Sequence, residues 1–298
     1  MKTLYKYKIY GLTVESVIEL PDLIAIPSGT PDVQINIGMV PESLSNPIDT
    51  GIFYQATKND FLFRFDKVGA YRIQDGNKIT VQVIGEIEDV RLFLLGSAFG
   101  ALLHQKGILA IHGSAISTPK GAIIFSGSSS VGKSSLVASL VKRGFNFIAD
   151  DIAAIHKHTD GFKVHPGIPH IKLWKDVVKD LNIKNNLPKV RDSMEKYKNP
   201  IGNEFFKIPI NINKIIILSV KNSPGYVIRE IKGAEKFEIL DRNTYRNHYI
   251  KGLQTSQIHF EHISYLASST PIFQVQRPSS PLNVNELTEF VIKKFITQ

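Results

Sequence analysis

One short stretch constrains the fold of this chain more than any other. It reads Gly127-Ser128-Ser129-Ser130-Val131-Gly132-Lys133-Ser134 and fits the pattern G-x-x-x-x-G-K-[ST] without a mismatch. The apolar run at 122–125 predicts a strand before it, and residues 135–143 predict a helix after it that ends at Gly144. A glycine loop between strand and helix binds phosphate because its N–H groups and the helix N-terminus point at the oxygens. The stretch therefore predicts a nucleotide phosphate site.

Two side chains of this loop have a predicted role of their own. Lys133 is expected to reach the β- and γ-phosphates of ATP, and the Ser134 hydroxyl to ligate Mg²⁺. The rest of the loop and Ser135, at the start of the helix, complete the expected nucleotide-binding set. A serine- and glycine-rich surface loop without a ligand is the alternative.

Two adjacent carboxylates follow the next predicted strand. The apolar run at 145–149 ends in Asp150 and Asp151. Phosphoryl transfer needs an acidic group for Mg²⁺ at such a strand end, and a group that takes the proton of the attacking hydroxyl. The two carboxylates could divide these tasks, with Asp150 as the metal ligand, whereas the alternative is an exposed turn.

His112 is expected at the end of the strand that precedes the loop strand, in the apolar stretch 108–116. It could therefore lie beside the γ-phosphate. A core histidine whose hydrogen bonds are satisfied is the alternative.

Periodicity predicts an α/β fold with a phosphate-loop domain at 89–298 and a β-rich N-terminal domain at 1–88. Alternation predicts strands at 6–10, 32–37 and 61–65, and the turn Asp75-Gly76-Asn77 predicts a hairpin over 69–84. An apolar helix is expected at 89–106 with Gly107 as its stop, and a last helix at 284–296 with Asn283 as its cap. The polar segment 182–205 predicts a mobile loop near the site.

Composition excludes several classes of protein. Without cysteine there are no disulfides, thiolate zinc sites or thiol catalysis. The longest apolar run, at 92–103, is shorter than the ~20 residues that span a bilayer, and no signal peptide is visible, so a soluble, cytoplasmic protein without a membrane partner is expected.

The net charge of +9 includes a run of basic residues between 172 and 198. This run is either a docking surface for an acidic partner such as a peptide or a solvated surface. No pattern typical of nucleic-acid binding is present.

Four features between residues 112 and 151 together resemble the kinase domain of HPr kinase/phosphorylase. They are His112-Gly113, the glycine loop, Lys142-Arg143-Gly144 and Ala149-Asp150-Asp151. The resemblance implies that Asp151 accepts the proton of a substrate serine, that Asp150 is its acidic neighbour, and that His112 is an active-site histidine. It also implies a phosphate role for Lys133 and a Mg²⁺ role for Ser134.

The remaining chain resembles a looser group of HPr-kinase-like proteins, in which a β-rich region begins with a stretch like that at residues 10–16. Some members of this group phosphorylate a serine of a lasso-peptide precursor. The implied function is an ATP- and Mg²⁺-dependent kinase for a serine on a peptide or protein, most specifically the C-terminal serine of such a precursor. The family's hexamer makes a homo-oligomer possible. A small-molecule kinase and a nucleotide-responsive binding protein without transfer activity remain as alternatives.

The sequence also departs from the family. His170-Ile171-Lys172-Leu173 stands where the family has Glu-Ile-Arg-Gly, which argues against a reverse phosphorylase reaction. The family's further basic catalytic residue has no obvious match. The candidates are Arg191, Lys198 and Lys207.

Overall fold

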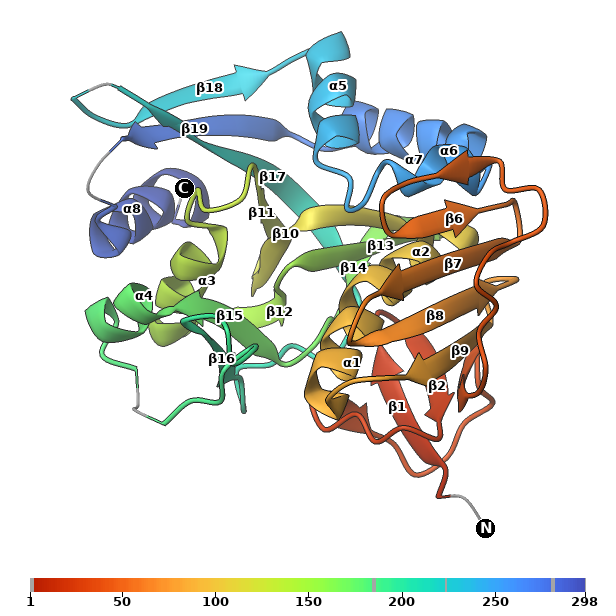
Figure 1. Ribbon diagram of the computed structural model, residues 1–298. Coiled ribbons are helices and arrows are strands. Elements are labelled where there is room, and N and C mark those ends of the chain that lie inside the picture. Colours follow the sequence, from red (N-terminus) through yellow and green to blue (C-terminus); the bar gives the residue numbers. More distant parts are fainter. Residues whose placement is uncertain (1–2, 184–185, 223, 280–281, 298) are drawn as a thin grey trace. The chain divides into compact units, whose positions relative to one another are not determined.

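The computed structural model describes residues 3–183, 186–222, 224–279 and 282–297, in a mixed α/β architecture with two large sheets (Figure 1). By their internal contacts the residues form two compact units. One comprises Met1–Ala110 and Thr244–Ile263, and the other Ile111–Asn243 and Ser264–Gln298. The predicted domain boundary between residues 88 and 89 stays a prediction. The first unit also includes residues 89–110 and 244–263, which lie beyond that boundary.

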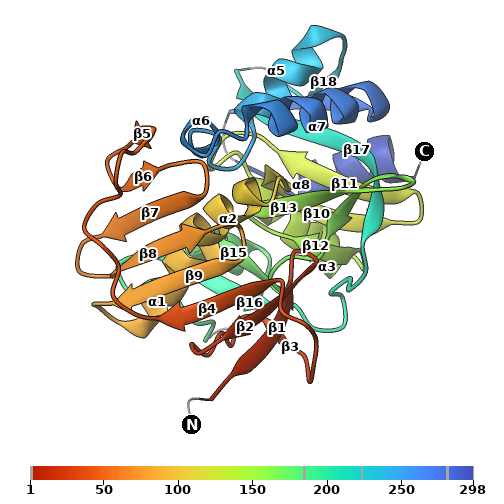
Figure 2. The ribbon, with the colours of Figure 1, turned by 90° about the vertical axis from the view of Figure 1, so that its right-hand side faces the viewer.

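The first unit is built on a nine-stranded sheet (Figure 2) with the order β3-β1-β2-β4-β9-β8-β7-β6-β5. The strands are β1 (Tyr5–Ile9), β2 (Leu12–Ser16), β3 (Ile24–Ala25), β4 (Val33–Ile37), β5 (Asp49–Thr50), β6 (Tyr54–Ala56), β7 (Asp60–Phe65), β8 (Gly69–Gln74) and β9 (Lys78–Val83). The predicted hairpin is confirmed, because β8 and β9 pair in antiparallel fashion around Asp75 and Gly76.

The predicted apolar helix of this unit is present in three consecutive segments. They are α1 (Ile87–Phe93), the π-helical η1 (Leu94–Ala98) and α2 (Phe99–Gln105). The Tyr71 hydroxyl donates to the Val90 carbonyl oxygen at 2.9 Å, and Val90, Leu94 and Leu103 are fully buried. Burial of this apolar surface holds the helix on the sheet. Gly107, at φ +66°, ends it as predicted.

The second unit contains an eight-stranded sheet. Its main order is β11-β10-β13-β14-β17-β19-β18, with β12 paired to β10 and β11 paired to β17. The strands are β10 (Leu109–Thr118), β11 (Gly121–Ser126), β12 (Asn146–Ala149), β13 (Ile152–His158), β14 (Gly161–His165), β17 (Ile210–Lys221), β18 (Val227–Ile231) and β19 (Ile272–Pro278). The run β11-β17-β19 is parallel. Its three C-terminal ends therefore share one edge, where ligands of parallel α/β sheets bind.

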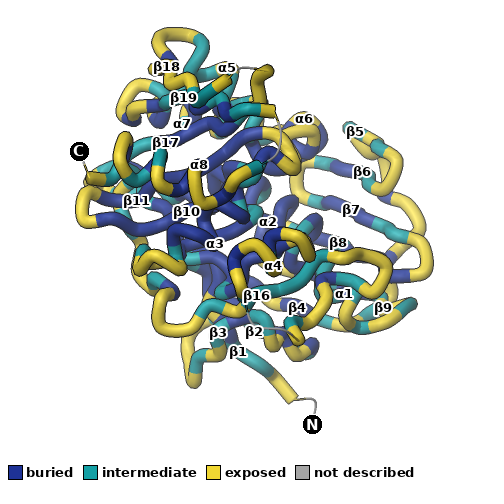
Figure 3. The backbone as a smooth tube through the Cα atoms, turned by 90° about the vertical axis from the view of Figure 1, so that its left-hand side faces the viewer, coloured by how far each residue is buried: buried dark blue, intermediate teal, exposed yellow. Residues whose placement is uncertain are grey.

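The second unit also contains the helices α3 (Lys133–Lys142), α4 (Lys175–Asp180), α5 (Ala234–Arg242) and α8 (Val284–Val291) and the π-helical η2 (Ile292–Ile296). The helix α6 (Tyr249–Gly252) belongs to the first unit, and α7 (Ser256–Ser269) begins in the first unit and ends in the second. Residues of α3, β10 and β11 are mostly buried (Figure 3). Asn283 caps α8 as predicted, since its side-chain oxygen accepts from the Glu286 N–H at 3.1 Å.

Two local predictions are wrong. Within the segment 182–205, whose residues 184–185 lie outside the described part, the structure contains β16 (Lys196–Pro200) paired with β15 (His170–Trp174). The sequence of β16 is polar and does not predict a strand. The strand forms because it pairs with β15, and it has no buried face that would give an alternating apolar pattern. His112 lies inside β10 instead of at its end.

None of the helices in the described part of the chain has the length and apolar character needed to cross a bilayer.

Candidate active site

The predicted glycine loop connects β11 to α3, as the sequence indicates. Gly127 follows β11 with φ +132°, and a Cβ there would lie 2.3 Å from the Leu218 carbonyl oxygen of β17. Gly132 is the N-cap of α3 at φ +107°. Both positions require glycine, because a side chain would be strained and, at Gly127, would collide with backbone. The two glycines therefore turn the chain tightly between β11 and α3, next to β17.

Lys133 is folded back onto the loop. Its side-chain amine donates to the carbonyl oxygens of Gly127 at 2.8 Å and Ser128 at 2.9 Å. The residue is 7% exposed, and this burial lowers the pKa of its amine while Asp150 and Asp151 oppose the shift. An anionic ligand in the loop would offer the ammonium a stronger, charge-assisted partner than these two neutral carbonyls.

Asp150 is fixed by three donors. Its Oδ1 accepts from the hydroxyls of Ser114 at 2.6 Å and Ser134 at 2.8 Å, and its Oδ2 from the Lys172 N–H at 2.9 Å. The carboxylate thus joins β10, α3 and β15 at one point. A carboxylate has about four lone-pair positions, so one more ligand can be accepted.

Asp151 is held in a left-handed backbone conformation, at φ 73°. Its carbonyl oxygen accepts from the Gly113 N–H at 3.2 Å and lies 3.0 Å from His112 Nδ1. A carbonyl oxygen only accepts, so His112 Nδ1 carries the proton. This left-handed conformation is strained for a residue with a side chain, and the two contacts of the carbonyl oxygen maintain it.

The Asp151 carboxylate lies between two basic groups. Oδ2 is 3.2 Å from Lys172 Nζ, and Oδ1 is 3.5 Å from His112 Nδ1. Burial raises the pKa of Asp151, but Lys172, His112 and the more distant Lys196 outweigh it and bring the pKa to about 2. Burial and Lys133 lower the pKa of His112. At neutral pH the carboxylate is therefore charged and the imidazole is neutral.

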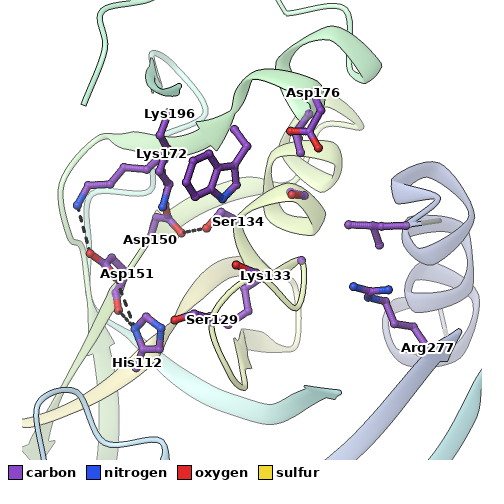
Figure 4. Close-up of a pocket in the computed structure, with 16 residues that line it drawn as sticks. His112, Ser129, Lys133, Ser134, Asp150, Asp151, Lys172, Asp176, Lys196 and Arg277 are labelled. Atoms are coloured by element: carbon purple, nitrogen blue, oxygen red, sulfur yellow. Dashed lines mark hydrogen bonds and ion pairs between the residues drawn. The ribbon is translucent and has the colours of Figure 1, made fainter. Parts of the chain in front are cut away.

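These groups line one cavity of about 460 Å³ (Figure 4). This volume is in the range of small-molecule sites. The described lining residues are His112, Ser129, Ser130, Gly132, Lys133, Ser134, Ser135, Asp150, Asp151, Lys172, Trp174, Asp176, Val177, Lys196, Arg277 and Leu282. Figure 4 shows His112 and Asp151 on one side of Lys133 and Arg277 on the other.

The structure thus brings together most of the residues that the sequence predicted for the site. Three predicted loop residues are not among the described lining residues: Gly127, Ser128 and Val131. Gly127 and Ser128 face Lys133 through their carbonyls, and the Val131 carbonyl accepts from Arg277. They shape the loop through their backbone.

The basic residues of the cavity differ from the candidates that the sequence offered. Among the described lining residues are Lys172, Lys196 and Arg277, and none of Arg191, Lys198 and Lys207. Lys172 belongs to the stretch His170–Leu173, in which the sequence departs from the family motif, and this departure is a sequence signal that points to it. Lys196 and Arg277 reach the cavity through the β15–β16 pairing and the β17–β19 pairing, which local sequence does not reveal.

Oxygen ligands for a hard cation are available beside the loop. Among the described residues, no group of three or more His, Asp or Glu side chains forms a ready metal site. Mg²⁺, however, is usually held by one or two protein oxygens plus water and substrate phosphates. The Ser134 hydroxyl and the Asp150 carboxylate, 2.8 Å apart, fit that requirement.

Comparisons with known proteins find distant similarity among solved structures. No family model and no curated protein matches the chain. Among solved structures, the Hpr(Ser) kinase/phosphatase from Coxiella burnetii is similar over 62% of this chain and 88% of that chain, with 12% sequence identity and a TM-score of 0.31. Similarity at this level carries no functional weight, so function is inferred from the site.

Proposed function

We propose that this protein is a kinase that transfers the γ-phosphoryl group of ATP to a serine hydroxyl of a peptide or protein. The observation that supports it most is the shared cavity of the Lys133–Ser134 pair and the Asp151 carboxylate. A phosphate-binding loop alone would be sufficient for a nucleotide-responsive binding protein without transfer activity. A charged, oriented carboxylate beside the loop adds an acceptor for the proton of an attacking hydroxyl.

Each side chain has a part in the proposed reaction. The loop N–H groups and Lys133 bind the phosphate chain and neutralise its charge. Asp151 accepts a hydrogen bond from the serine hydroxyl and orients its oxygen toward the γ-phosphorus. The oxygen–phosphorus bond forms, the bond between the γ-phosphorus and the β–γ bridging oxygen breaks, and ADP leaves. The hydroxyl proton passes to Asp151.

The low pKa of Asp151 fits such a role in one respect. With a pKa of about 2, the carboxylate is charged throughout the neutral range and always able to accept a hydrogen bond. It is a weak base, so the proton moves late, after the oxygen has begun to bond phosphorus. A loose transition state needs little deprotonation beforehand. Positioning therefore contributes more than basicity.

Mg²⁺ is proposed at the Ser134 hydroxyl and the Asp150 carboxylate, where it would neutralise charge that develops on the phosphate oxygens. The three donors to Asp150 hold this ligand in place.

The acceptor proposed is the C-terminal serine of a lasso-peptide precursor. The resemblance of the sequence to HPr-kinase-like proteins supports it. The basic side chains of Lys172 and Lys196 at the cavity suit a C-terminal carboxylate next to that serine. The proposed cellular location is the cytoplasm.

The experiment is a transfer assay with γ-labelled ATP and Mg²⁺. The acceptors are serine-ended precursor peptides, the same peptides amidated at the C-terminus, HPr and small hydroxyl metabolites. We expect label on the serine-ended peptide and less on its amide. Asp151→Asn should reduce transfer by about 10²–10⁴-fold, the range of general base catalysis.

The matched control is Asp160→Asn, which changes an exposed carboxylate of the β13–β14 turn and should leave transfer unchanged. Label on a metabolite alone would show a small-molecule kinase. ATP binding without any transfer, unaffected by Asp151→Asn, would contradict the kinase and favour a nucleotide-responsive binding protein.

A further inference from the structure

Arg277 is a buried cation at the end of β19. The residue is 7% exposed, and burial lowers the pKa of its guanidinium. Within the described residues no carboxylate forms an ion pair with it. Nε donates to the Val131 carbonyl oxygen at 3.0 Å, and Nη1 to the Pro278 carbonyl oxygen at 2.8 Å. Buried charges in proteins are normally paired, because an unpaired one loses its hydration without compensation.

Arg277 lies beside the glycine loop. The parallel strands β11, β17 and β19 end at one edge, so the loop after β11 and the end of β19 lie at the same edge. The bond to Val131 fixes the guanidinium beside the loop residue that precedes Gly132. Leu282 beyond β19 also contacts the loop, since a Cβ on Gly132 would lie 3.2 Å from its Cδ2 atom.

The remaining donors of Arg277 have no hydrogen-bond partner among the described residues and are available to a ligand in the cavity. A guanidinium has five N–H donors, and the two bonds above use two of them. The side chain lines the cavity together with Lys133 and Ser135. Figure 4 shows it on the side of Lys133 opposite to Asp151. A phosphate chain whose γ-end faces Asp151 therefore has its nucleoside end toward Arg277.

We infer that Arg277 binds the phosphate group at the nucleoside end of the bound nucleotide, which supplies the counter-charge that no described residue provides. This inference rests on the proposed function, because it assumes that ATP occupies the loop. It identifies a nucleotide-binding residue outside the glycine loop, on the last strand of the sheet. Lys133 and Arg277 then bind the phosphate chain from two sides.

The test is calorimetric titration of wild type, Arg277→Gln and Arg277→Lys with ATP, ADP and inorganic tripolyphosphate, each with Mg²⁺. Glutamine keeps a donor for the Val131 carbonyl but removes the charge. We expect Arg277→Gln to weaken all three ligands by roughly 10- to 100-fold, the worth of a charge-assisted hydrogen bond. Arg277→Lys keeps the charge and should therefore lose less affinity for the three ligands than Arg277→Gln. Arg229→Gln, on β18 and paired with the exposed Glu235, is the matched control and should bind like wild type.

A second measurement separates binding from a structural role. Since no carboxylate among the described residues pairs with this charge, Arg277→Gln should not lower the unfolding temperature of the free protein, but it should reduce the increase that ATP produces. A lower temperature for the free variant with a normal response to ATP would overturn the inference. If Arg277→Gln lowers the affinity for ATP but not for ADP, the inference is also overturned, because Arg277 then binds the γ-phosphate. If the variant lowers the affinity for ATP and ADP but not for tripolyphosphate, the inference is overturned because Arg277 then contacts the base. Wild type that binds none of the ligands would refute the proposed function itself.

Discussion

Lys172→Met is expected to destabilise the second unit in a pH-dependent way. Lys172 Nζ lies 3.2 Å from Asp151 Oδ2 and is the strongest of the groups that lower the pKa of Asp151. Methionine keeps much of the side-chain length and apolar stem but removes the charge. The Lys172 N–H that binds Asp150 belongs to the backbone and is retained.

The magnitude follows from the pKa. A shift from the ordinary value of 3.8 to about 2 corresponds to about 2.4 kcal/mol of stability at neutral pH. Part of this shift comes from His112 and Lys196, and the Asp151 side chain is 34% exposed to screening solvent, so the contribution of Lys172 is about 1–2 kcal/mol. The folded-state pKa is the lower one, so the contribution is complete above pH 3.8 and disappears as the pH falls through 2. About half of it is gone at pH 3.

The assay is urea denaturation at pH 7 and pH 3, followed by fluorescence. Trp174 is the only tryptophan in the chain and lies two residues from Lys172, so its emission reports on this unit. We expect the wild type to exceed Lys172→Met by about 1–2 kcal/mol at pH 7 and by about half as much at pH 3. In an Asp151→Asn background the effect of Lys172→Met should no longer depend on pH.

The matched control is Lys163→Met, which removes the partner of the exposed Asp160 in the same unit. Its effect should be smaller at both pH values, because solvent screens exposed pairs. If Lys172→Met costs the same stability at pH 3 as at pH 7, the electrostatic reasoning is refuted and Lys172 acts through packing.

Two further predictions concern stability. The pKa of the buried His104, whose Nε2 contacts the Tyr245 carbonyl at 2.7 Å, is lowered by burial to about 4, so the folded first unit resists its protonation. As the pH falls from 6.5 through 4, the free energy of unfolding of the wild type should decrease by roughly 2–3 kcal/mol relative to that of His104→Gln. Urea titrations at several pH values would measure this decrease, and a difference that does not depend on pH would contradict the prediction. Asn283→Ala should cost about 1 kcal/mol by removing the α8 cap, measurable as a lower unfolding temperature, with Asn283→Asp retaining stability.

The elements whose signal is local were predictable from the sequence. The turn at Asp75-Gly76 defines the β8–β9 hairpin, and Asn283 marks the start of α8, because turn and cap chemistry act between residues close in the chain. The glycine loop belongs to this group as well, since its backbone conformation depends on Gly127 and Gly132.

The basic residues of the cavity were not predictable in the same way. Lys196 lies on β16, a polar strand that pairs with β15, and Arg277 lies on β19, far along the chain from the glycine loop. Both side chains line the cavity. Arg191 and Lys198 are as basic as these two, so composition could not distinguish them. A side chain reaches the site through strand pairing over long sequence separation, and single-sequence periodicity contains no such information.

The sequence by itself determined the loop, its flanking strand and helix, and the paired carboxylates of Asp150 and Asp151. Only the tertiary structure decided the environment of those carboxylates. Three chain segments meet at Asp150, and Lys172 and His112 flank Asp151 from β15 and β10. The physical reason is that electrostatic interactions depend on distance in space, whereas the motif records only order along the chain.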